Sequence, residues 1–177
     1  WLDVEQLASA ETQLKYASEP SNFLWTVLQL YRGSFLEGLD LQGAPEYGEW
    51  LLMERERHRR TALSVSQNLA AYALQQGDDE LAIQALRRTL DIEPWHEGAH
   101  RQLILSLARS GDSTAALAQY AICQRVLAEE LGIDPMAETS ALAERIRAAR
   151  LKKRRHPLPA QPIAFVGRIE EIKSLRQ

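Results

Sequence analysis

The sequence predicts an all-α fold, built as a right-handed stack of antiparallel helix pairs. Helical periodicity runs through the chain and no alternating strand pattern interrupts it. The stretch 69–123 also contains one helical hairpin written twice, because Gly77-Asp78 and Gly111-Asp112 lie 34 residues apart between amphipathic segments. A Gly-Asp pair at such a junction is typical of one helix ending and the next beginning. Each copy is therefore expected to form a helix, a turn and a second helix.

The same offset relates further apolar and small residues. These pairs are Leu69 and Leu103, Ala73 and Leu107, Ala82 and Ala116, Leu86 and Tyr120, and Thr89 and Cys123. The period, together with a small residue where the two helices pack closely, resembles the tetratricopeptide repeat. One departure is that the first copy closes with Pro94, whereas the second runs on to Pro135.

The bulk composition limits the classes of function. A chain of 177 residues that is 45% hydrophobic can bury a core of its own. A net charge of −3 provides no overall field that would attract nucleic acid or membranes. There is no apolar run of about 18 residues and no signal-peptide pattern, so we expect a cytoplasmic protein without a membrane partner. Its single cysteine, Cys123, fits a reducing compartment and is expected to be a buried packing residue rather than a reactive thiol.

The N-terminal part is expected to hold two short helices and a loop. The first helix covers residues 1–17, and the second surrounds Phe23 and ends at Gly33. Residues 34–45 contain two glycines and a proline, which is typical of a loop. We expect this loop to be held by the side chains of Phe35, Leu36 and Leu39.

A long helix follows, with no internal glycine or proline between Gly48 and Gly77. Roughly thirty residues would span about 45 Å, so this helix is expected to join the N-terminal helices to the repeat pair. Its first half mixes arginine with glutamate over residues 54–60, which predicts a salt-bridged face, with a partner-facing role as the alternative. Further helices are expected over residues 79–91, 95–110, 112–131 and 136–155, with Gly132 as a left-handed cap.

Several signatures coincide in order and spacing. They are Tyr31-Arg32-Gly33 with Phe35-Leu36, Trp50, the arginine-rich residues 54–60, the segment 91–94, and the closing segment 131–135. Together they resemble the bacterial transcriptional activator domain, the tetratricopeptide-type module of SARP-type regulators of antibiotic pathways. The resemblance covers about residues 3–146.

The resemblance also implies a domain organisation. In that family the module follows an OmpR-like winged-helix DNA-binding domain and, in larger members, precedes a STAND/NB-ARC-like ATPase. Phe165-Val166-Gly167-Arg168 resembles the entry motif of such an ATPase. We therefore expect a domain over residues 1–150, a basic and proline-rich linker over 151–164, and the start of a truncated ATPase over 165–177, in a fragment of a longer protein.

No cofactor is expected in this fragment. The phosphate-binding pattern G-x-x-x-x-G-K-S/T is absent from the sequence, so ATP and Mg are expected only for the missing downstream domain. DNA contact is likewise expected only through the missing upstream domain.

The family resemblance implies a non-enzymatic module for protein–protein interaction and signal relay. Its expected partners are a second copy, RNA polymerase subunits or neighbouring domains of the same chain. Repeat geometry predicts a concave surface formed by the first helix of each repeat. The residues nominated for it are Gln67, Ala71 and Leu74 from one hairpin and Arg101, Leu105 and Arg109 from the next.

A small zinc-dependent hydrolase is the alternative. His96, Glu97 and His100 match H-E-x-x-H, in which two histidines on one helix face bind zinc and the glutamate acts as general base. However, His96 follows Pro94 by two residues, and neither of the other two histidines has the spacing of a third ligand, although an acidic residue could replace it. The repeat register also accounts for the segment without metal, with Glu97 at a helix N-terminus and His100 packed in the hairpin.

A third hypothesis is direct DNA binding through the basic residues between Arg147 and Arg155. The run has no interleaved aromatic residues and falls where a helix meets the linker. A solvated helix C-terminus, favoured by the helix dipole, is the preferred interpretation.

Overall fold

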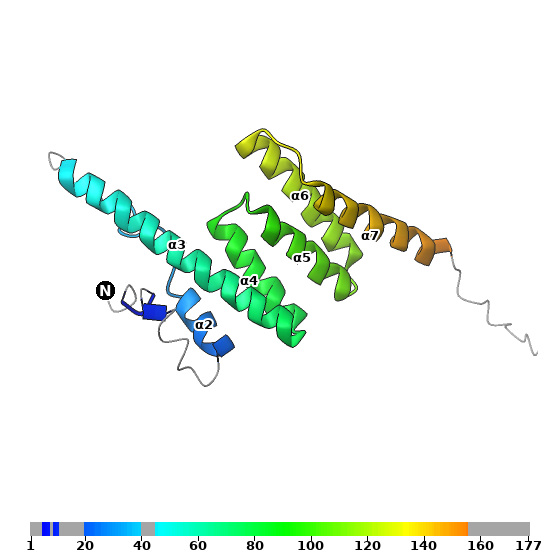
Figure 1. Cartoon of the computed structure of the whole chain (residues 1–177), viewed down its shortest axis with the longest axis horizontal. Coiled ribbons are helices and arrows are strands. Elements are labelled where there is room, and N and C mark those ends of the chain that lie inside the picture. Colours follow the sequence, from blue (N-terminus) through cyan, green and yellow to red (C-terminus); the bar gives the residue numbers. More distant parts are fainter. Residues whose placement is uncertain (1–4, 8, 11–19, 40–44, 156–177) are drawn as a thin grey trace, which may run out of the picture.

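The computed structural model describes residues 5–7, 9–10, 20–39 and 45–155, which form helices and parts of the segments that join them (Figure 1). The helices are α2 (Pro20–Leu28), α3 (Pro45–Gln76), α4 (Asp79–Ile92), α5 (Glu97–Arg109), α6 (Ser113–Leu131) and α7 (Ala137–Arg155). Each of these helices packs on the next along the chain, and α5 also contacts α7. No strand occurs in the described ranges. The predicted all-α stack of helix pairs is confirmed.

The two Gly-Asp turns have the same geometry. Both glycines have a positive φ, 74° at Gly77 and 92° at Gly111, in a region that other residues avoid. Each following aspartate caps the next helix, since its Oδ1 accepts from the backbone N–H three residues on, at 3.0 Å for Asp78 and 2.8 Å for Asp112. The 34-residue repeat is thus reproduced in the hydrogen bonds that cap the two helices.

The buried positions of the two hairpins also repeat at the same offset. All ten residues that the offset pairs are buried, and Ala82 and Ala116 have no exposed surface. An alanine at that position allows the second helix of each hairpin to approach its neighbours closely, as dense core packing requires.

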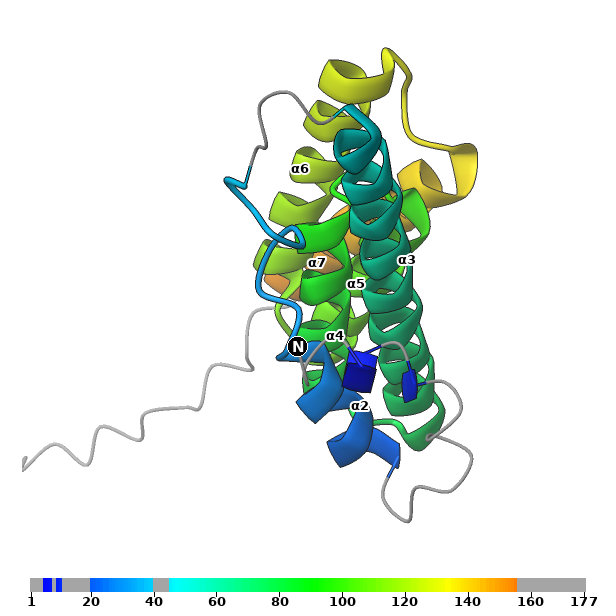
Figure 2. The same cartoon turned by 90° about the vertical axis from the view of Figure 1, so that its left-hand side faces the viewer.

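The long helix α3 joins two parts of the molecule. Its N-terminal half extends past the end of α4, and helix α2 packs on α3 (Figures 1 and 2). The predicted salt-bridged face is present: Glu56 accepts from Arg59 at 2.8 Å and from Arg60 at 2.6 Å. These two hydrogen bonds lower the pKa of Glu56 to about 2. Arg59 also lies 3.5 Å from Glu93, just after α4, and so links the two helices.

Two helix boundaries differ from the prediction by more than one residue. Helix α2 ends at Leu28 rather than near Gly33, because the next N–H groups bond to carbonyls three residues back, at 3.0 Å from Leu30 and 3.3 Å from Tyr31. Helix α5 begins at Glu97 because the His96 ring caps it. Such caps depend on side-chain placement, which helical periodicity does not report.

The loop after α2 is held differently from the expectation. Leu36 and Leu39 are 41% and 43% exposed, so the prediction that their side chains hold the loop is wrong. Phe35 holds the loop as predicted, because its ring packs against Trp50 and His58, and the rest of the loop is fixed through its backbone. Arg55 donates from Nε to the Phe35 carbonyl at 2.9 Å and from Nη2 to the Leu36 carbonyl at 2.8 Å.

Candidate functional site

The six residues nominated for a partner surface lie on the first helices of the two hairpins, α3 and α5. Ala71, Leu105 and Arg109 are exposed, whereas Gln67, Leu74 and Arg101 are half-buried. Three pockets, of about 810, 600 and 390 Å³, are lined by other residues.

The polar members of this set bond within the molecule. The pairs are Gln67 Nε2 with His96 Nε2 at 2.9 Å, Arg101 Nη1 with Thr139 Oγ1 at 3.5 Å, and Arg109 Nε with Asp79 Oδ2 at 3.4 Å. These contacts connect α5 to its neighbours. The side chains that remain for a partner are chiefly Ala71 and Leu105, the latter 42% exposed.

The His96 side chain caps helix α5. Its Nδ1 accepts from the Ala99 N–H at 3.0 Å, and its Nε2 lies 2.9 Å from the side-chain amide of Gln67. Both ring nitrogens of His96 are therefore engaged with protein groups. The contact to Gln67 also ties the start of α5 to α3.

His100 is a core residue, 1% exposed. Its Nε2 donates to the Pro94 carbonyl at 2.8 Å, and its Nδ1 accepts from the Gln119 amide on α6 at 2.7 Å. Burial lowers the pKa of His100, because desolvation disfavours the charged ring. The neutral imidazole is thus fully hydrogen-bonded, as the repeat register predicted when it placed His100 in the hairpin.

Glu97 completes the H-E-x-x-H segment. Its Oε1 accepts from the Met136 N–H at 2.7 Å, immediately before α7. Capping of α5, a core hydrogen-bond pair and the start of α7 therefore account for all three residues of the zinc-hydrolase alternative. In the part of the chain that the structure describes, no group of three or more His, Cys, Asp or Glu side chains is arranged to hold a metal ion.

Cys123 is fully buried on the packing face of α6, as predicted. Burial, and next the negative charge of Glu97, raises the pKa of the Cys123 thiol to about 11. The thiolate is the reactive form, so this cysteine is not a nucleophile near neutral pH.

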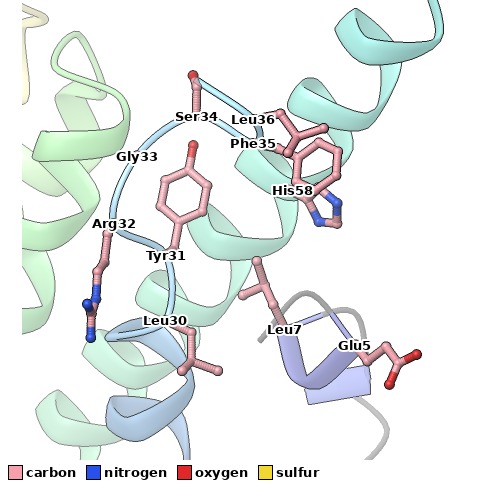
Figure 3. A pocket seen from close by; sticks show the side chains of 10 residues that line it. All are labelled: Glu5, Leu7, Leu30, Tyr31, Arg32, Gly33, Ser34, Phe35, Leu36 and His58. Carbon is pink, nitrogen blue, oxygen red and sulfur yellow. The ribbon is translucent and has the colours of Figure 1, made fainter. Parts of the chain in front are cut away.

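The largest of the three pockets, of about 810 Å³, lies between the α2–α3 loop and α3 (Figure 3). It is lined by Glu5, Leu7, Leu30, Tyr31, Arg32, Gly33, Ser34, Phe35, Leu36 and His58. The sequence drew attention to residues 31–36 as a family signature, but not as a site. Two smaller pockets of about 600 Å³ and 390 Å³ lie beside Leu52 and Met53 and beside Trp25.

Aromatic contacts and a second arginine organise the wall of the largest pocket. The Phe35 ring lies over His58, with centroids 4.9 Å apart, and meets Trp50 edge-on at 6.2 Å. Arg88 on α4 donates to the Tyr31 carbonyl. The loop is therefore fixed from both α3 and α4.

The basic residues of α7 have mixed surroundings. Arg147 pairs with Glu144, and its guanidinium lies 5.5 Å from the centroid of the Tyr120 ring. Arg150 and Lys152 are exposed. Residues 151–155 of the predicted linker form the end of helix α7, whereas the rest of the linker and the ATPase-entry motif, residues 156–177, lie outside the described residues. DNA binding through this run stays a prediction.

Within the described ranges, none of the helices combines the length and apolar composition needed to cross a bilayer.

The comparisons with known proteins agree on one family. The model of the bacterial transcriptional activator domain matches residues 3–147. The regulatory protein AfsR of Streptomyces coelicolor is 30% identical over 148 residues, which is 82% of this chain and 14% of that protein. AfsR of Streptomyces griseus is 34% identical over 96 residues, or 54% of this chain and 10% of that protein. The transcriptional regulatory protein MoaR1 of Mycobacterium tuberculosis is 30% identical over 131 residues, or 74% of this chain and 40% of that protein. The chain thus spans less than half the length of each relative.

Proposed function

We infer the function of this chain from its family. The chain belongs to the bacterial transcriptional activator domain family, a module of transcription regulators. Within a SARP-type regulator, it binds a protein partner and passes a signal between flanking domains, and it carries out no catalysis. DNA is bound by an upstream domain of the full-length protein. A downstream ATPase domain, beginning near residue 165, supplies the ATP and Mg chemistry.

The observation that supports this proposal most directly is the exposure of two positions that lie 34 residues apart in the repeat, one on α3 and one on α5. Ala71 and Leu105 are exposed, while the neighbouring Gln67 and Arg101 are held by hydrogen bonds to His96 and Thr139. A surface whose framework is already ordered loses little conformational entropy when a partner helix or extended segment binds to it.

The partner is a second copy of the chain, a subunit of RNA polymerase or a neighbouring domain. We would measure the light-scattering mass of the purified chain alone over a range of concentrations, and then mixed with sigma or with the C-terminal domain of the alpha subunit. A concentration-dependent dimer or a stable complex is expected. A strict monomer that binds neither protein would contradict recruitment and self-association.

A double variant tests the surface itself. Ala71→Glu with Leu105→Glu places two charges on exposed positions, so partner affinity should fall at least about tenfold while the circular dichroism spectrum stays helical. Gln124→Glu adds one charge on an exposed position of α6 and is the control. Unchanged binding by the folded double variant would remove the surface from the proposal. Reversal of Arg101 and Arg109 is less specific, because it also breaks their contacts to Thr139 and Asp79.

A further inference from the structure

We propose that the pocket between the α2–α3 loop and α3 binds a small, uncharged, aromatic molecule that carries a hydroxyl or a similar hydrogen-bonding group. This site lies apart from Ala71 and Leu105, so the inference goes beyond the interaction module proposed above.

The size and lining of the pocket suit such a ligand. Its volume of about 810 Å³ falls in the range of small-molecule sites, which are concave and lined mainly by apolar and aromatic side chains. The side chains of Leu7, Leu30, Tyr31, Phe35 and Leu36 supply that lining from two separate segments of the chain (Figure 3).

The pocket is preformed, because the loop is anchored by its main chain. Arg55 donates to the carbonyls of Phe35 and Leu36, and Arg88 donates to that of Tyr31. The side chains of the loop therefore need not occupy the pocket in order to keep the loop in place. Leu36 even keeps a left-handed conformation, with φ of 48°, which is unfavourable for leucine and is maintained by the surrounding contacts.

Hydrogen-bonding groups at the pocket are available to a ligand. The hydroxyls of Tyr31 and Ser34 have no hydrogen-bond partner among the residues that the structure describes. Burial raises the pKa of Tyr31 further above neutrality, so its hydroxyl is a permanent donor. Ser34 is exposed and Tyr31 is half-buried, so water can reach both hydroxyls, and a ligand hydroxyl can take the place of that water.

The surrounding rings and charges define the class of ligand. Tyr31 and Phe35 present ring faces and edges, against which an aromatic body packs in offset or edge-on geometry, while His58 is buried against the Phe35 ring. The two charged lining side chains, those of Glu5 and Arg32, point away from the Tyr31 ring (Figure 3). A neutral aromatic molecule is therefore favoured over an ionic one.

The probe for the first experiment is 2-naphthol, titrated into the ¹⁵N-labelled chain and followed by two-dimensional NMR. Saturable shifts are expected for the amides of residues 30–36 and of His58, with a Kd below about 1 mM. Shifts that do not saturate, or that concentrate elsewhere in the chain, would overturn the proposal.

Two variants locate the site. Leu30→Trp fills the pocket and should weaken 2-naphthol binding at least tenfold, whereas the same substitution at Leu105 on α5 should leave it unchanged. Tyr31→Phe keeps the ring and removes the hydroxyl, so we expect about 3- to 10-fold weaker binding of 2-naphthol and unchanged binding of naphthalene.

Each result decides the matter. Equal affinity of the wild-type chain and a folded Leu30→Trp variant would overturn the site. If that variant does not fold, the decision rests on Tyr31→Phe, and equal weakening of both probes would contradict the role of the hydroxyl. Failure here leaves the light-scattering test of the interaction module unaffected, because Ala71 and Leu105 lie on another surface.

Discussion

In the hairpin α3–α4 the buried polar pair is Ser66 and Thr89, whose hydroxyl oxygens lie 3.0 Å apart. The residues 34 positions later in the hairpin α5–α6 are His100 and Cys123. His100 bonds to the Pro94 carbonyl and to the Gln119 amide, and Cys123 packs as a neutral thiol. The turns of the two hairpins match, whereas their buried polar groups do not.

The difference shows which positions of the repeat are free to diverge. Thr89 bonds to Ser66 and to its own helix, so the first hairpin satisfies its polar pair internally. In the second hairpin, the start of α5 reaches outward through His96 to α3 and through Glu97 to the start of α7. Turn geometry has to repeat if the helices are to stack, but buried hydrogen bonds need only match the local neighbours.

The largest effect that separates the hairpins is expected at His100. His100→Leu removes two part-buried hydrogen bonds, to the Gln119 amide and to the Pro94 carbonyl, so the free energy of unfolding should fall by about 2–3 kcal/mol. Ser66→Ala removes one neutral hydroxyl pair and should lower it by only about 1 kcal/mol. Urea unfolding followed by circular dichroism measures both. Equal losses of stability in the two variants would contradict the difference between the hairpins.

Acid should weaken the second hairpin selectively. Burial holds the pKa of His100 below its ordinary value of 6.5, so below pH 6.5 the unfolded chain binds more protons than the folded one. The free energy of unfolding should therefore decrease as the pH falls through 6.5, by at most about 1.4 kcal/mol for each pH unit. His100→Gln has no titrating ring, and its unfolding measured over the same pH range should show a smaller slope. Parallel slopes would argue against this role.

The shared turns predict equal effects. Gly77→Ala and Gly111→Ala should each lower the free energy of unfolding by about 1–2 kcal/mol, since alanine is unfavourable at a positive φ. No atom lies within 4 Å of the added methyl group at either turn, so the loss arises from the backbone alone. Gly48→Ala, in helix α3 and equally open, is the matched control and should stabilise the chain by about 0.5–1 kcal/mol. Thermal unfolding of the three variants tests this, and unequal losses at the turns would contradict their equivalence.

The smallest effect is expected at the helix caps. Asp78→Ala and Asp112→Ala each remove one capping hydrogen bond and should lower the free energy of unfolding by about 1 kcal/mol. Asparagine at either position keeps an acceptor and should restore most of the loss. If only one aspartate matters in chemical unfolding, the two turns are equivalent in geometry but not in energy.

The helices and turns were predictable because their signals are local. Gly77 and Asp78 specify a turn by themselves, and the same is true of their counterparts 34 residues later. The exposed position of Leu36 was not predictable, because the loop is held by Arg55, which lies 19 residues further along. No periodicity reports which carbonyl a distant arginine will reach.

The candidate sites divide in the same way. The repeat register assigned the nominated surface to α3 and α5, since register fixes the helix and its face. It did not reveal that Arg109 pairs with Asp79 across helices. The pocket at Tyr31 was missed because its walls come from segments whose contacts arise only in the folded chain. In the H-E-x-x-H segment, the residues that would bind zinc instead make capping and core hydrogen bonds. The motif alone therefore did not determine what these residues do.

The bond from the Met136 N–H to Glu97 has a mechanical consequence. Helix α7 follows α6 in the chain, yet its start is attached to the first turn of α5, and Thr139 within it contacts Arg101. A load applied along α7 is therefore carried directly into α5 and is shared with α6. Tension along the helix axis, applied at the C-terminal end of the described chain, would load both of these bonds at once.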